Sequence, residues 1–286
     1  MWPANQTKID AMVGDGLLLD IGGWCDPLLR ADYVLDVFPY ETRGIAYHGI
    51  GNLPVTCVYP EPLPGERFTK ATWILHDICS ERPFPFPDKM FDFVVCSHTL
   101  EDVRDPLRAC SEIMRVGKAG YIETPSRLGE SLMYYDKLVG AAHHRWIVEI
   151  QGNRISFRMK HHFLHTRPEF YVPPSYKRTM PKERAITYLF WENAFECEEI
   201  SGYEFYEETR AFIASLRIPK YLYWLDYGRG MKHRARCYWR DVIWPTLSGH
   251  RRSQPAEELW TWGKLFEVSK TYAQQARSKT GTEQYS

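Results

Sequence analysis

The chain has 286 residues, 44% of them hydrophobic, and its 36 lysines and arginines balance 36 aspartates and glutamates. This size is sufficient for a buried core, and we expect one large domain or one domain with an appendage. The balanced charge excludes a strong overall attraction to nucleic acid or to anionic lipid. Residues 1–13 lack a secretory pattern, no apolar run has the ~20 residues of a membrane helix, and the seven scattered cysteines are typical of reduced thiols. We therefore expect a soluble, cytoplasmic protein without membrane partners.

Short apolar strands alternate with turns and helices in the first half, which favours a mostly parallel α/β sheet. Asp105 as N-cap and Pro106 at the first helical position predict a helix that ends at Gly117. We also expect a helix over 127–142 and a long irregular loop over 38–70. The predicted strands are 17–21, 33–37, 72–75, 91–96 and 120–124, followed by a hairpin of 145–150 and 154–159.

The second half of the chain has a different composition. Segments such as AITYLFWENAF and YEETRAFIASLRI predict a mainly helical extension over 166–276, followed by a disordered tail at 277–286. The basic aromatic segment RGMKHRARCYWR is suited to carbohydrate or polyanion binding, because rings stack on sugars and Arg binds anions. An amphipathic surface, solvated or part of a homodimer, is an equal alternative. A nucleic-acid substrate is less favoured.

Acidic or polar side chains end four predicted strands. Asp20 ends the first strand before a turn at Gly22 and Gly23, where glycine lets a ligand approach the backbone. Asp36 ends the second, where a carboxylate can accept both hydroxyls of a ribose. The third is followed by Asp77, and the fourth ends in Ser97 and His98. Open α/β sheets bind ligands at this edge, so the pattern predicts a ligand site, although Asp20 or Asp77 alone could equally be a cap.

These segments resemble the class I S-adenosylmethionine-dependent methyltransferases, especially the branch that modifies small molecules and glycans. The resemblance lies in LLLDIGGWCDP, YVLDV, ILHDIC, PFPDKMFDFVVCSHTLEDVRDP and GYIETPS, in this order, and covers roughly residues 15–165. It implies a methyltransferase domain over 1–165 with a Rossmann-like, seven-stranded sheet, one strand being antiparallel. It also implies S-adenosylmethionine as cofactor, across the ends of the first, second and fourth strands. The implied contacts are Asp20, Gly22, Gly23 and Trp24 at the methionine part, Asp36 and Val37 at the ribose, Asp77 and Ile78 at the adenine, and Ser97 and His98 near the sulfonium.

Two positions depart from the family pattern. Trp24 stands where the family usually has a further glycine, and Asp102 where relatives often have the histidine of Leu-Glu-His-Val. The indole of Trp24 either swings outward as a lid or narrows the pocket. The second case is the basis of an alternative function, a non-catalytic binding or assembly protein with a degenerate cofactor site. An NAD-dependent or nucleotide-sugar protein shares the glycine turn but has no need of the FDFVVCSHTLEDV block.

Methyl transfer requires an aligned acceptor and, for a hydroxyl, removal of its proton, for which histidine is suited near neutral pH. The candidate catalytic residues are His98 and His144, ranked first, then Glu123 and His143. No spacing is diagnostic of a metal site. A Mg²⁺-assisted version would draw ligands from Glu123, Asp136, His143, His144, His161 and His162. The predicted function is methyl transfer to an oxygen or nitrogen of a sugar-containing metabolite or natural product.

Overall fold

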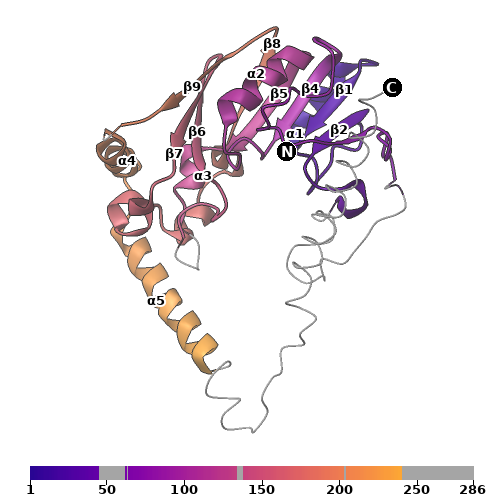
Figure 1. The fold of residues 1–286 in the computed structure, drawn as a ribbon. Helices are drawn as coiled ribbons and strands as arrows, with labels where there is room; N and C mark the ends of the chain where they lie inside the picture. Colours follow the sequence, from indigo (N-terminus) through magenta and orange to yellow (C-terminus); the bar gives the residue numbers. More distant parts are fainter. Residues whose placement is uncertain (45–61, 63, 134–137, 203, 240–286) are drawn as a thin grey trace.

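The computed structural model describes residues 1–44, 62, 64–133, 138–202 and 204–239 (Figure 1). The predicted tail at 277–286 and much of the predicted loop at 38–70 lie outside these residues. The described chain contains a six-stranded sheet in the order β3-β2-β1-β4-β5-β8, parallel throughout except for β8, which pairs antiparallel with β5. Its strands are β1 (Leu18–Ile21), β2 (Tyr33–Asp36), β3 (Trp73–Leu75), β4 (Phe91–Ser97), β5 (Gly117–Pro125) and β8 (Ile186–Glu192).

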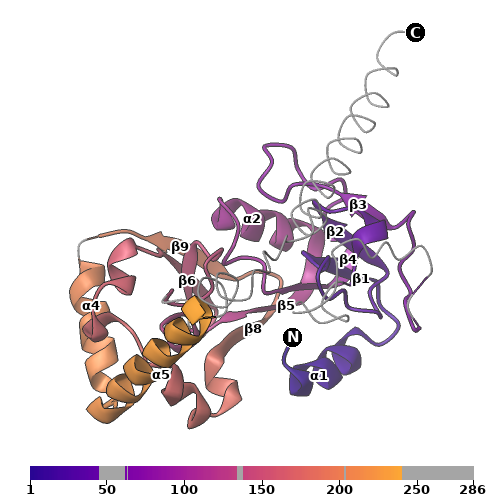
Figure 2. The ribbon, with the colours of Figure 1, turned by 90° about the horizontal axis from the view of Figure 1, so that it is seen from below.

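The sheet confirms the predicted α/β class, and its order follows the doubly wound arrangement, which changes direction between β1 and β4. Two helices cover it, α1 (Pro3–Val13) and α2 (Pro106–Val116), which Figure 2 shows on opposite sides. Alternate residues of each strand point to opposite faces, so Leu19 packs in the core beside α2 while Leu18 packs beside α1. The predicted cap of α2 is confirmed, since the Asp105 side chain accepts from Arg108 N at 3.0 Å.

A second, three-stranded sheet contains the predicted hairpin. It has the order β6-β7-β9, with β6 and β7 antiparallel, as expected, and β7 and β9 parallel. Figure 1 shows α5 extending away from both sheets. The remaining elements are β6 (Trp146–Gln151), β7 (Arg154–Met159), β9 (Glu196–Ile200), α3 (Arg127–Glu130), α4 (Glu204–Ser215) and α5 (Lys220–Tyr238), with 3₁₀ turns at Tyr40–Thr42, His162–His165, Pro168–Phe170, Pro174–Arg178 and Lys182–Ala185.

The predicted helix over 127–142 is wrong for the described residues beyond its first turn, and 134–137 lie outside the described residues. Of the described positions only α3 is helical, because Leu132 and Met133 instead form β-bridges to Val172 and Val139. Gly140 then turns the chain with a φ of +64°. The bridge from Leu132 to Val172, which is far along the chain, has therefore replaced the local helix, and neither composition nor spacing could reveal it.

Helix was also wrongly predicted over 186–200, where the structure has β8 and β9. β8 completes the sheet against β5, and its buried residues Leu189 and Trp191 alternate with exposed Tyr188. Pairing with β5, about 70 residues earlier in the chain, makes this segment a strand. One strand of the main sheet therefore comes from residues 166–276, the region predicted to be a helical extension. Among the described residues the sheet has six strands rather than seven. α4 and α5 are helical, as expected, while the part of the predicted extension at 240–276 lies outside the described residues.

The helix α1 has no counterpart in the sequence predictions, although Pro3 stands at one of its first positions. Its buried residues Ile9 and Val13 cover one face of the sheet. None of the described helices is both long enough and apolar enough to cross a membrane.

Candidate functional site

A cavity of about 980 Å³ opens at the carboxyl ends of β1, β2, β3 and β4. It includes the point where the strand order changes direction, the usual ligand site of open α/β sheets, and its volume is within the range of ligand pockets. Every residue that the resemblance assigns to the cofactor lines this cavity: Asp20, Gly22, Gly23, Trp24, Asp36, Val37, Asp77, Ile78, Ser97 and His98. His143 and His144 line it too, whereas Glu123 is not among its lining residues.

The glycine turn after β1 is tightly packed. Gly22 has a φ of +75°, and a Cβ added there would lie 2.1 Å from the Thr99 hydroxyl oxygen. A Cβ at Gly23 would lie 2.3 Å from Asp20 Oδ2. Both glycines therefore let neighbouring side chains close onto the turn, a packing role in addition to any approach of a ligand.

Trp24 lies in the cavity wall and does not fill the cavity. Its indole Nε1 donates to Thr42 Oγ1 at 2.9 Å, and its ring stacks on Phe38 with centroids 4.1 Å apart. Its backbone N–H donates to Asp36 Oδ2 at 3.0 Å. Because these contacts hold the indole beside the end of β2, the turn at Gly22 and Gly23 remains open to the cavity.

Two buried carboxylates end the first two strands. Burial raises the pKa of Asp20 to about 7, although Leu28 N donates a hydrogen bond to its carboxylate, which by itself lowers the pKa. Burial likewise raises the pKa of Asp36 to about 6, although Phe38 N and Trp24 N donate to its two oxygens. Each carboxylate oxygen has a second lone pair, so Asp36 can still accept from a ligand diol.

At the end of β3 the structure gives Asp77 a local role. Its Oδ1 accepts from Cys79 N at 2.8 Å, and its Oδ2 lies 3.2 Å from Arg104. No helix lies in the described residues 76–90 between β3 and β4, so Asp77 is not the helix cap considered from the sequence. It stabilises a turn, and the same side chain also lines the cavity. Ile78 beside it is buried and supplies an apolar surface.

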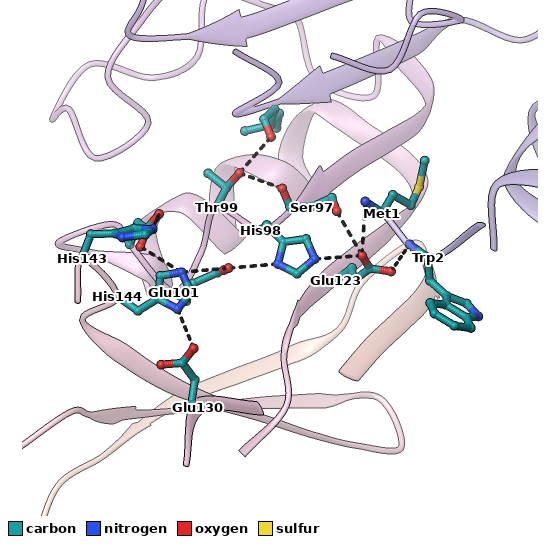
Figure 3. Close-up of polar contacts among 12 residues, drawn as sticks. Met1, Trp2, Ser97, His98, Thr99, Glu101, Glu123, Glu130, His143 and His144 are labelled. Atoms are coloured by element: carbon teal, nitrogen blue, oxygen red, sulfur yellow. Dashed lines mark hydrogen bonds and ion pairs between the residues drawn. The ribbon is translucent and has the colours of Figure 1, made fainter. Parts of the chain in front are cut away.

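His98 follows β4 with a φ of +54°, an uncommon conformation for a residue other than glycine. Its ring lies between two buried carboxylates, with Nδ1 3.4 Å from Glu101 Oε1 and Nε2 3.1 Å from Glu123 Oε1 (Figure 3). Burial disfavours the charged ring, but these carboxylates raise the pKa of His98 to about 9. At neutral pH His98 is therefore an imidazolium paired with both carboxylates, and it is poorly suited to accept a proton.

Glu123 acts as a buried anchor. Its carboxylate accepts from Trp2 N at 2.8 Å and from the Tyr121 hydroxyl, as well as from His98. Burial alone would raise the pKa of Glu123, but these hydrogen bonds lower it to about 2. Glu123 therefore positions His98 and is itself 1% exposed, which removes it from contact with an acceptor in the cavity.

A second polar group is formed by His143 and His144. His144 Nδ1 is hydrogen-bonded to Glu130 Oε1 at 2.6 Å, and its Nε2 lies 3.8 Å from Asp102 Oδ1 (Figure 3). His143 Nε2 lies 3.9 Å from Asp102 Oδ2. Burial disfavours protonation of His144, but the Glu130 carboxylate raises its pKa overall. Ligand-type atoms of Asp102, His143 and His144 all lie within 4.8 Å of one another.

This grouping differs from the metal ligands expected from the sequence. Asp136 lies outside the described residues, and Glu123 is committed to His98. His161 packs against Phe163 and Phe205, His162 is exposed, and neither belongs to the group of Asp102, His143 and His144. Mg²⁺ binding by the expected set of ligands has no support in the structure.

Sequence reasoning missed three acids of the site, namely Glu101, Asp102 and Glu130. The first two stand in the Leu-Glu-Asp-Val stretch, whose departure from the family pattern was the available signal. Glu130 gave no signal, because it fell within a segment expected to be an ordinary helix.

Residues 61–122, from before β3 to within β5, match the family model of the methyltransferase domain. This segment contributes Asp77, Ile78, Ser97 and His98 to the cavity. The matched segment and the sheet order together support the class I S-adenosylmethionine-dependent methyltransferase family. No curated protein sequence matches the chain significantly.

Several solved structures are partly similar. One is an S-adenosylmethionine-dependent methyltransferase from Mesorhizobium loti, with 16% identity over 56% of this chain and 63% of that chain, and a TM-score of 0.32. Another is a SAM-dependent methyltransferase from Aquifex aeolicus, with 19% identity over 44% and 64% of the two chains, and a TM-score of 0.27. The aligned parts span 43–64% of the similar solved chains, less than two thirds of each.

Proposed function

We propose that the protein is an S-adenosylmethionine-dependent methyltransferase whose acceptor atom is an oxygen, or a nitrogen, of a sugar-containing metabolite or natural product. The observation that carries the proposal is the cavity at the ends of β1 to β4, which brings together all the side chains assigned to the cofactor. They come from four separate strand ends. The matched methyltransferase segment supports the same activity.

The cavity residues fit such a cofactor. Asp36, ionised above a pH of about 6, would accept from the ribose hydroxyls. The turn at Gly22 and Gly23 would lie against the methionine part, and Ile78 would pack on the adenine. When bound, the cofactor supplies a methyl group: its bond to sulfur breaks with the electron pair left on sulfur, a bond to the acceptor atom forms, and the acceptor loses its proton.

The proton of a hydroxyl acceptor would be removed at the His143 and His144 end of the cavity. His98 already carries its proton at neutral pH, because Glu101 and Glu123 both stabilise the imidazolium. Although burial disfavours protonation, the pKa of His144 is raised too, by Glu130, Glu101 and Asp102. Only its Nδ1 is hydrogen-bonded, to Glu130, and its Nε2 lies 3.8 Å from Asp102 Oδ1, so this nitrogen is available to an acceptor hydroxyl. A histidine oriented by a carboxylate in this way is a suitable group for proton removal.

A sugar-containing acceptor is supported by the exposed aromatic rings of α5. Tyr221, Trp224 and Tyr227 are 61–72% exposed, and such rings commonly stack on the faces of sugars. α5 is not among the described walls of the cavity, so these rings would contact a part of the acceptor remote from the methylated atom. Screening glycans and glycosylated metabolites for a mass gain of one methyl group tests this part of the proposal.

Titration calorimetry with S-adenosylmethionine and S-adenosylhomocysteine tests the cofactor site. We expect both to bind, and Asp36→Ala to weaken binding by about 10- to 100-fold, the effect of losing hydrogen bonds to a charged group. Asp88→Ala is the matched control, because Asp88 is exposed, pairs with Arg115 and lies outside the cavity. Absence of binding heat for both ligands in the wild-type protein would overturn the proposal.

A further inference from the structure

Asp102, His143 and His144 form a cluster of ligand-type side chains in the wall of the cavity. We propose that this cluster binds a divalent transition-metal ion of the Zn²⁺ type, and that the ion polarises the acceptor hydroxyl. Two histidines and one carboxylate are the ligand set of several catalytic zinc sites, which leave one position open for water or substrate. Imidazole favours such ions over Mg²⁺, which prefers oxygen ligands.

The distances are compatible with this ion. Asp102 Oδ1 lies 3.8 Å from His144 Nε2, and Asp102 Oδ2 lies 3.9 Å from His143 Nε2. Around a tetrahedral ion with bonds of ~2.1 Å, neighbouring ligand atoms are about 3.4 Å apart. The ligand atoms of all three residues lie within 4.8 Å of one another, so the cluster would have to close by up to about 1.4 Å. The side chain of His143, which is 71% exposed, is free of tight packing and can make that adjustment.

An outer shell of the kind found at metal sites is already present. Glu130 Oε1 holds His144 Nδ1 at 2.6 Å, so the proton of a neutral ring would be on Nδ1 and the lone pair on Nε2. Lys160 Nζ in turn donates to Glu130 Oε2 at 3.1 Å. Metal-binding histidines commonly donate their other ring N–H to a carboxylate in this way, which fixes the ring orientation.

The second observation is a set of buried carboxylate oxygens without hydrogen bonds beside the cluster. Glu101 is fully buried, and neither of its carboxylate oxygens has a hydrogen bond. Its Oε1 lies 4.0 Å from His144 Nε2, the atom that would bind the ion, and 3.4 Å from His98 Nδ1. The buried Oδ1 of Asp102 likewise has no hydrogen bond. A divalent cation between these groups would offset the cost of burying them.

The role assigned to the ion rests on the proposed function. The cluster lies in the same cavity as Ser97 and His98, at the end assigned to the acceptor. With the ion bound, His144 Nε2 would be a ligand and not a base, and the ion would take over its role: a hydroxyl bound by the ion would have a lower pKa, so its proton would pass to water as the oxygen takes the methyl group. Metal binding itself requires neither the cofactor nor an acceptor, and it can be measured separately.

The test uses the full chain, stripped of metal with a chelator, and titrates Zn²⁺ by calorimetry without cofactor. We expect one ion per chain, Mg²⁺ binding at least tenfold weaker, and visible absorption bands of a low-symmetry Co²⁺ complex when Co²⁺ is added. Asp102→Asn and His143→Ala should each weaken Zn²⁺ binding at least tenfold, the lower end of what even an outer partner contributes. His162→Ala removes an exposed histidine outside the cluster and should leave the affinity unchanged.

The metal site would be overturned if the wild-type chain did not bind Zn²⁺. It would also be overturned if Asp102→Asn and His143→Ala both bound Zn²⁺ with the affinity of the wild type. Because His143 is exposed, His143→Ala serves as the decisive variant if Asp102→Asn fails to fold. Asp36→Ala separates this proposal from the proposed function: it should retain Zn²⁺ affinity while losing affinity for S-adenosylhomocysteine. A chain that binds Zn²⁺ through the cluster but not S-adenosylhomocysteine would retain the site and lose the methyltransferase assignment.

Discussion

His98 Nε2 lies 3.1 Å from Glu123 Oε1, joining the end of β4 to a carboxylate buried within β5. The pKa of His98 is raised from 6.5 to about 9, against the effect of burial, by Glu101 and Glu123. The contribution of His98 to the free energy of unfolding is therefore fully present below pH 6.5 and is lost as the pH rises through about 9. The pKa of Glu123 is lowered from 4.5 to about 2, so its stabilisation is present above pH 4.5 and is lost as the pH falls toward 2.

Stability is thus predicted to depend on this pair at alkaline pH. The free energy of unfolding, measured with urea between pH 5 and 10, should decline from pH 6.5 to 9 more steeply in the wild type than in His98→Gln. The variant has no proton to lose in that range. If the free energy of unfolding fell equally steeply in the two proteins, the ion pair would not be the cause of the loss of stability at alkaline pH.

The glycine turn provides a second prediction. Gly22→Ala combines a φ of +75° with a Cβ 2.1 Å from Thr99 Oγ1, whereas Gly152→Ala combines a φ of +62° with no atom within 4 Å. Both variants incur backbone strain, but only the first is overpacked. We expect Gly22→Ala to lose about 1–3 kcal/mol more unfolding free energy than Gly152→Ala. Adding Thr99→Gly should recover part of that difference, and a double-mutant cycle without coupling would contradict the contact.

Cofactor affinity is predicted to depend on the ionisation of Asp36. Because burial raises the pKa of Asp36 to about 6, its carboxylate becomes protonated as the pH falls through that value. Protonation removes a lone pair needed for the ribose hydroxyls, so the dissociation constant of S-adenosylhomocysteine should rise about tenfold from pH 7 to pH 5. Calorimetry over this range checks the prediction. Asp36→Asn should bind weakly with a flatter profile, and a wild-type affinity independent of pH would refute the role of Asp36.

Turnover should depend more on His144 than on His98. His144→Ala is expected to lower turnover by about 100-fold, the usual scale for loss of a proton-removing group. His98→Gln should have a smaller effect, since a pKa raised to about 9 keeps His98 protonated at neutral pH. Formation of S-adenosylhomocysteine with an acceptor from the mass-gain screen measures both. A larger loss of turnover in His98→Gln than in His144→Ala would contradict the assignment of proton removal to His144.

Much of the cavity could be predicted from the sequence, and the reason is geometric. Parallel strands share one edge, so acids that follow successive apolar strands, such as Asp20 and Asp36, necessarily lie near one another. The helix capped by Asp105 and the hairpin around Gly152 were equally predictable. Their signals are contained within a few neighbouring residues.

Only the tertiary structure decided how the polar residues are paired. Glu130 meets His144, and Trp24 turns onto Phe38 and Thr42, through contacts that no local pattern encodes. β8 is a strand because β5 offers it an unpaired edge and buried positions for alternate residues. Sequence periodicity specifies which face of an element is apolar, whereas partner choice depends on where distant segments meet in the folded chain.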